Sequence, residues 1–109
     1  MKKVIVTVEN CEEVAKELAE YLFDKPLRIS TFFLRERKIE GPYEVSEVKA
    51  LSGFSYQGGK LTIRLTPRRT IFWDVSKEKV LVIYRKDGSI VIEREIEKNT
   101  TIFRNISIV

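Results

Sequence analysis

The chain has 109 residues, of which 43% are hydrophobic, and a formal net charge of +4 at pH 7. This length fits one domain, residues 1–109, with a core of its own. Histidine is absent and cysteine occurs once, at Cys11, which excludes an internal disulfide, a multi-cysteine zinc site and a nucleophile activated by histidine. We accordingly expect no enzyme activity, no metal and no other cofactor.

The hydropathy pattern does not indicate a membrane protein. The longest uninterrupted apolar run, Val80 to Tyr84, is much shorter than a membrane span, and the N-terminal segment lacks the long apolar stretch of a secretory signal. We therefore expect a cytoplasmic protein with no membrane partner. Charged residues make up 33% of the chain, and a composition rich in Glu and Lys is typical of thermophile proteins.

The N-terminal quarter predicts a strand followed by a helix. Asn10 is placed as an N-cap, with Glu13 three positions later in a capping-box arrangement. Apolar residues then recur at helical spacing and predict an amphipathic helix over residues 11–23, which Asp24-Lys25-Pro26 ends. The preceding strand is predicted from the alternation of three valines with other residues, at Val4, Val6 and Val8.

The next segment predicts one long strand over residues 27–39, ended by Gly41-Pro42. Residues 43–52 fit either a short helix that begins at Ser46 or a further strand, and we favour the strand. Alternation in the long strand assigns Leu27, Ile29, Thr31 and Phe33 to one face. It assigns the other face to Arg28, Ser30, Phe32 and Leu34.

Two hairpins follow. Gly58-Gly59 as a two-residue turn pairs Tyr56 with Leu61 and Phe54 with Ile63. This register predicts a face of apolar residues, namely Phe54, Tyr56, Leu61, Ile63 and Leu65. The opposite face is predicted to carry Ser55, Gln57, Lys60, Thr62 and Arg64.

The second hairpin uses Asp87-Gly88 as a two-residue turn between Val80–Arg85 and Ser89–Ile96. Both of its faces are partly apolar, which predicts central strands covered on both sides. One face is predicted to carry Leu81, Ile83, Ile90 and Ile92, and the other Val80, Val82, Tyr84 and Val91. Asn99-Thr100 then turns the chain into a last strand that needs a partner. The predicted fold is α+β: one predominantly antiparallel sheet of about six to seven strands, curved or partly closed, with the N-terminal helix packed on one face.

Positive charge is concentrated in two segments. Residues 25–38 hold five basic side chains and one acid, and residues 60–79 hold six basic side chains and two acids, whereas residues 1–24 are acidic. Both basic segments contain adjacent aromatic residues. Basic side chains that contact phosphates, combined with exposed rings that stack on bases, bind single strands without sequence preference. A binding face on one side of the molecule would produce this charge asymmetry.

The leading hypothesis is therefore a non-enzymatic protein that binds single-stranded nucleic acid, DNA or RNA, largely independently of sequence. Its predicted phosphate contacts are Arg28, Arg35, Arg37, Lys38, Arg64, Arg68 and Arg69. Its predicted stacking rings are Phe32, Phe72 and Trp73. The competing interpretation is structural, because paired rings on strands usually belong to a core and basic residues on strand exteriors protect sheet edges.

A second hypothesis is a protein-interaction or assembly subunit without catalytic activity. In it, Ile102–Val109 pairs with the sheet edge of a partner, most simply in a homodimer. A third is an enzyme that works without histidine, such as a nuclease, for which the sequence offers no candidate base.

Overall fold

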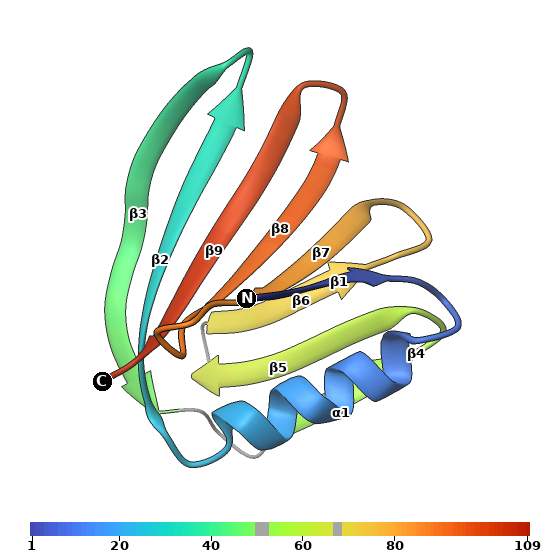
Figure 1. Cartoon of the computed structure of the whole chain (residues 1–109), viewed down its shortest axis with the longest axis vertical. Helices are drawn as coiled ribbons and strands as arrows, with labels where there is room; N and C mark the ends of the chain where they lie inside the picture. The colour runs from blue at the N-terminus through green and yellow to red at the C-terminus, as the bar shows by residue number, and fades with distance from the viewer. Residues whose placement is uncertain (50–52, 67–68) are drawn as a thin grey trace.

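The computed structural model describes residues 1–49, 53–66 and 69–109. Within these residues the chain forms one helix and nine strands, arranged as a six-stranded sheet and a three-stranded sheet (Figure 1). All strand pairs are antiparallel, and the large sheet is not closed. The predicted α+β class, with a mostly antiparallel sheet and one N-terminal helix, is confirmed.

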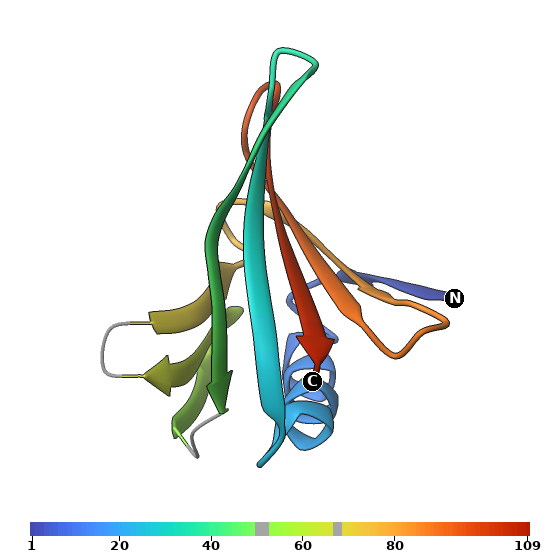
Figure 2. The ribbon, with the colours of Figure 1, turned by 90° about the vertical axis from the view of Figure 1, so that its left-hand side faces the viewer.

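The elements have the following bounds. The large sheet has the order β1-β7-β8-β9-β2-β3, with β1 (Lys2–Val6), β7 (Lys79–Tyr84), β8 (Ile90–Glu97), β9 (Thr100–Ile108), β2 (Pro26–Arg35) and β3 (Lys38–Lys49). The small sheet consists of β4 (Gly53–Gln57), β5 (Lys60–Thr66) and β6 (Arg69–Asp74). The helix α1 is Cys11–Leu22. Figure 2 shows the small sheet beside the lower half of the large sheet, with the β2–β3 and β8–β9 hairpins extending beyond it.

One hydrophobic core joins α1 to both sheets. The helix contributes Cys11, Val14, Ala15, Leu18 and Leu22. The small sheet contributes Leu61, Ile63, Ile71 and Trp73. The large sheet contributes Val6, Leu27, Ile29, Val80, Val82, Ile90, Ile92 and Ile106. We call this side of the large sheet its inner face and the opposite side its outer face. In the described part of the chain, no helix is long and apolar enough to cross a membrane.

The start of α1 differs from the prediction. Asn10 occupies the N-cap position, but its side chain makes no capping hydrogen bond. Asn10 Oδ1 instead accepts a hydrogen bond from the Thr7 amide at 2.7 Å, and Asn10 Nδ2 donates to the Ile5 carbonyl at 2.9 Å. The Asn10 side chain thus stabilises the turn between β1 and α1, and the predicted capping box with Glu13 is wrong.

The predicted strand over residues 27–39 is interrupted by a turn. Glu36 and Arg37 have φ values of 48° and 67°, and the chain reverses there so that Arg35 pairs with Lys38. Asn and Gly are the residues that normally mark such a turn, and both are absent here, so the sequence did not reveal it. Gly41-Pro42, predicted to end the strand, lies inside β3 instead. The strand interpretation of residues 43–52 is confirmed for 43–49, and residues 50–52 lie outside the described part.

The two later hairpins had different outcomes. The β4–β5 register is confirmed, because Tyr56 pairs with Leu61 and Phe54 with Ile63. The β7–β8 register is wrong by one residue, because Tyr84 pairs with Ile90. The Arg85 amide donates to the Ser89 carbonyl at 2.9 Å, so the loop has three residues rather than two. A one-residue slip exchanges the faces of a strand, and Leu81, Ile83 and Val91 therefore share the outer face.

The C-terminal strand β9 has partners within its own chain. It pairs with β2 along its whole length and with β8 from Thr100 to Ile106. Both of its edges are therefore hydrogen-bonded over that stretch. The prediction that Ile102–Val109 pairs with the sheet edge of a homodimer partner is wrong for this reason.

Candidate nucleic-acid interface

The structure does not bring the two basic segments together on one surface. Arg28 and Phe32 lie on the outer face of the large sheet, where Phe32 is half-buried opposite Phe103. Arg35, Arg37 and Lys38 are exposed at the far end of the β2–β3 hairpin. The basic residues of the first segment therefore lie in two separate places on the large sheet. Neither place is joined by strand pairing to the second segment, which belongs to the small sheet.

Trp73 is not a stacking ring. Its side chain is 0% exposed, and its Nε1 donates to Cys11 Sγ at 3.4 Å. It is part of the interface between β6 and α1, which corrects the predicted role. Arg68 lies outside the described residues, and only the backbone of Arg69 is described.

The remaining residues of the second segment lie on the outer surface of the small sheet. Thr62 pairs with Phe72, and Arg64 pairs with Thr70. Paired residues share a face of the sheet, and their neighbours along each strand, such as Leu61 and Ile71, are buried in the core. This surface, which we call the basic face, consists of Ser55, Gln57, Lys60, Thr62, Arg64, Thr70 and Phe72, together with the buried Asp74, which pairs with Lys60.

Phe72 is the exposed ring of the basic face. Its side chain is 41% exposed. Because it pairs with Thr62, the exposed residues Lys60 and Arg64 lie diagonal to it on β5, at roughly 7–8 Å between backbone positions in ideal sheet geometry. A shallow hollow of about 440 Å³ lies over this region, lined in part by Ser55, Lys60 and Phe72. The ring is thus flanked by two cations on an open surface.

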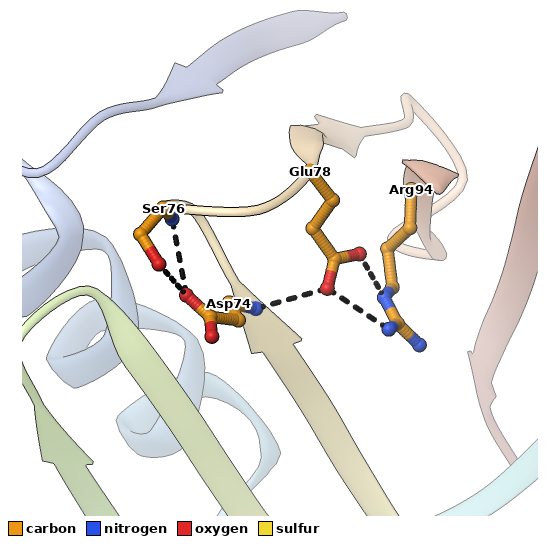
Figure 3. A network of polar contacts seen from close by, with 4 residues as sticks. All are labelled: Asp74, Ser76, Glu78 and Arg94. Atoms are coloured by element: carbon orange, nitrogen blue, oxygen red, sulfur yellow. Dashed lines mark hydrogen bonds and ion pairs between the residues drawn. The ribbon is translucent and has the colours of Figure 1, made fainter. Parts of the chain in front are cut away.

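Asp74 lies on the same face of the small sheet as the ring, two residues along β6 and directly across from Lys60, but it is buried. It is 4% exposed, and its Oδ1 accepts hydrogen bonds from the Ser76 amide at 3.0 Å and the Ser76 hydroxyl at 2.6 Å (Figure 3). These bonds lower the pKa of Asp74 below its usual value. Its carboxylate therefore remains charged but is directed into the turn that follows β6.

An arginine of the large sheet braces Phe72. The Arg94 guanidinium lies 5.7 Å from the centre of the Phe72 ring. Glu78 holds this arginine through bonds of 2.6 Å to Nε and 3.0 Å to Nη2, and Glu78 Oε1 also accepts from the Asp74 amide at 3.1 Å (Figure 3). This network fixes the turn, β8 and the ring relative to one another, so the ring is held in place before any ligand binds.

Two further contacts tie the small sheet to its neighbours. Arg104 Nη1 donates to the Thr70 carbonyl on β6 at 2.9 Å. The hydroxyl of Tyr56 on β4 donates to the Glu12 carboxylate on α1, which lowers the pKa of Glu12 and raises that of Tyr56. The basic face is therefore anchored at both of its edge strands.

Sequence reasoning missed part of this site. The polar face with Lys60 and Thr62 was predicted from the β4–β5 hairpin, but these residues were not assigned to the site. Arg94 and Arg104 could not be found because their contacts depend on how distant strands pair. The sequence did contain one signal. At both positions a basic residue stands where the alternation of β8 and β9 places the side chain on the inner face of the sheet.

The chain is similar to two solved structures. The Bacillus subtilis YojF protein has 12% sequence identity with a TM-score of 0.66, over 100% of this chain and 96% of YojF. ChuX has 14% identity with a TM-score of 0.42, over 93% of this chain and 61% of ChuX. The likeness to YojF shows a shared fold and nothing further. No protein-family model and no curated protein matches the sequence.

Proposed function

We propose that this chain binds single-stranded nucleic acid through the basic face, largely independently of sequence and without catalysing a reaction. The observation that supports this most is the exposed ring of Phe72, with Lys60 and Arg64 diagonal to it on the same face of the small sheet. We place the activity in the cytoplasm, the compartment that the composition favours.

The chemistry of the face fits a single strand. An unpaired base has a free ring face that can stack on Phe72, at roughly 1–3 kcal/mol per base. Lys60 and Arg64 would contact phosphates, while the hydroxyl of Thr62 and the amide of Gln57 supply hydrogen bonds to phosphate or sugar oxygens. In a duplex the bases already stack on one another, so the contribution of Phe72 would be lost.

The other predicted contacts fall outside this proposal. Arg28 and Phe32 face the opposite side of the large sheet, and Arg35, Arg37 and Lys38 lie at its far end. We expect them to add to the long-range positive potential of the molecule without contacting the strand.

The experiment is a fluorescence anisotropy titration of labelled oligothymidine and oligouridine at low and moderate salt. Phe72→Ala should weaken binding by roughly 5- to 150-fold, the equivalent of one lost stacking contact. Phe23→Ala is the matched control, because Phe23 is also an exposed phenylalanine, at 62%, but lies at the end of α1. Intrinsic fluorescence is unsuitable because Trp73 is buried.

Two outcomes would overturn the proposal. One is the absence of binding to either oligonucleotide at low salt. The other is equal binding by wild type and Phe72→Ala. Binding that weakens steeply as salt rises would support phosphate contacts, because cations released from the strand return at high salt.

A further inference from the structure

The basic face meets the large sheet at a corner formed by two arginines. Arg94 and Arg104 lie on the inner face of the large sheet, because Arg94 follows the core residue Ile92 by two positions and Arg104 pairs with Ile92. The Arg94 guanidinium lies 5.7 Å from the centre of the Phe72 ring, and Arg104 Nη1 donates to the Thr70 carbonyl at 2.9 Å. Both contacted residues belong to the basic face, which therefore continues onto the large sheet.

Beyond this corner, the β2–β3 and β8–β9 hairpins carry the inner face past the small sheet (Figure 2). Cross-strand pairs follow this face from Arg104 to Thr31 on β2, and from Thr31 to Tyr43 on β3. A second row pairs Ile102 with Phe33. Paired residues share a face of a sheet. We call this surface the upper inner face, and it consists of Phe33, Tyr43, Arg94, Ile102 and Arg104.

Tyr43 is the exposed ring of the upper inner face. Its side chain is 47% exposed, and its ring meets the Phe33 ring edge to face, with 5.6 Å between the ring centres. The Arg35 guanidinium lies 5.0 Å from the centre of the Phe33 ring. Arg35 thus supports the ring pair, as Arg94 supports Phe72. Two supported and exposed rings therefore lie on one continuous surface.

The path between these two rings carries more positive than negative charge. Arg104 lies on this path, on the strand between β8 and β2. Arg94 lies beside it, and Glu78 balances its charge. At the β3 end of the path, the acid Glu40 shares its face with the exposed Lys38, two residues away. The charge of Arg104 is therefore left to attract phosphates.

We propose that a single strand bound at Phe72 continues across Arg104 and stacks a second base on Tyr43. This inference rests on the proposed function and extends its site to the large sheet. Three strand spacings separate β8, beside Phe72, from β3, which is about 14 Å across the sheet. A few nucleotides cover such a distance, within the roughly 4–16 nucleotides that single-strand-binding folds occupy. The ligand is thus an unpaired strand of several nucleotides rather than a mononucleotide.

The test is a fluorescence anisotropy titration at low salt with a labelled oligothymidine of about ten nucleotides. Tyr43→Ala should weaken binding by roughly 5- to 150-fold, the equivalent of one lost stacking contact. Tyr43→Leu should lose as much, because it keeps an apolar contact with Phe33 but has no ring. Tyr43→Phe keeps the ring and should bind like wild type. Circular dichroism establishes that each variant is folded.

The length of the strand provides a second readout. A dithymidine can occupy only one ring at a time, so Tyr43→Ala should change its affinity little. Wild type should therefore gain more affinity than Tyr43→Ala when the strand is lengthened from about two to about ten nucleotides, because the second contact is then made within one complex. Phe23→Ala again serves as the control for an exposed ring outside the path.

The outcomes separate this inference from the proposed function. A loss of affinity in Phe72→Ala, without a loss in Tyr43→Ala or Tyr43→Leu, would overturn the inference and leave the basic face as the whole site. An equal loss in Tyr43→Ala for both strand lengths would overturn the continuous path. Unchanged affinity in Phe72→Ala would overturn the proposed function, and this inference with it.

Discussion

Two adjacent residues on β6 show how alternation along a strand separates a core residue from a surface residue. Trp73 is completely buried and donates to Cys11 Sγ, whereas Phe72 is 41% exposed beside Arg94. The sequence alone identified both rings but could not decide which of them points outward. The pairing of Leu61 with Trp73 decides it, because both join the core.

At the same scale, Tyr84 tests how burial affects an ionisable group. Its hydroxyl is buried and meets no hydrogen-bonding group of the described residues. Burial raises the pKa of Tyr84 to about 12, and the charge of Glu17 contributes in the same direction. In the unfolded chain this hydroxyl ionises near 10.0, so its titration leaves the free energy of unfolding unchanged below pH 10 and lowers it as pH rises from 10 toward about 12.

We therefore predict that Tyr84→Phe raises the free energy of unfolding at neutral pH by roughly 1 kcal/mol, because it removes a buried polar group without a partner. The variant should also lose less stability than wild type between pH 10 and about 12. Urea denaturation at both pH values measures this, with the exposed Tyr43→Phe as control. A variant less stable than wild type at neutral pH would show that the hydroxyl is hydrogen-bonded.

At the scale of elements, the hairpins show which turns can be predicted. Gly58 and Gly59 both have positive φ, and because glycine favours such angles the β4–β5 register follows from the sequence. The β2–β3 turn places Glu36 and Arg37 at positive φ, so it has no glycine signal. Asp87-Gly88 does mark a turn. The same pair fits a two-residue or a three-residue loop, so the sequence does not determine the length of this loop.

The candidate site was predictable to a similar extent. Arg64 and Phe72 were predicted and do lie on one surface, because both belong to strands joined by short-range pairing. Arg94 contacts Phe72 and Arg104 contacts Thr70, so each contact joins residues more than 20 positions apart in the sequence. Local sequence patterns carry no information about such contacts. The grouping of Arg28 with Arg64 failed for the same reason.

The network that connects β6, β7 and β8 gives a prediction at this scale. Arg94→Met leaves the Glu78 carboxylate, whose side chain is 6% exposed, without its cation. We expect the free energy of unfolding to fall by about 2–3 kcal/mol. In a double-mutant cycle, Glu78→Gln combined with Arg94→Met should lose less than the sum of the two single variants.

Urea denaturation measures this cycle, and the exposed pair of Glu12 and Lys16 on α1 is the comparison, with an expected coupling below about 0.5 kcal/mol. Simple additivity at Glu78 and Arg94 would show that the two side chains do not interact in solution.

At the scale of the whole molecule, surfaces of different character lie on different layers. The helix is acidic, and the small sheet presents the basic face. Residues that are mixed along the chain are thus sorted by the fold.

Chemical-shift mapping by NMR can locate the surface that contacts a single strand. A uniformly labelled chain is titrated with an oligothymidine at low salt, and the shifted backbone amides are placed on the structure. We predict that the largest changes fall on β5 and β6 around Thr62 and Phe72, with little change at Arg28 or Arg37. Changes centred on the outer face or on the end of the β2–β3 hairpin would contradict the account, as would no change at all.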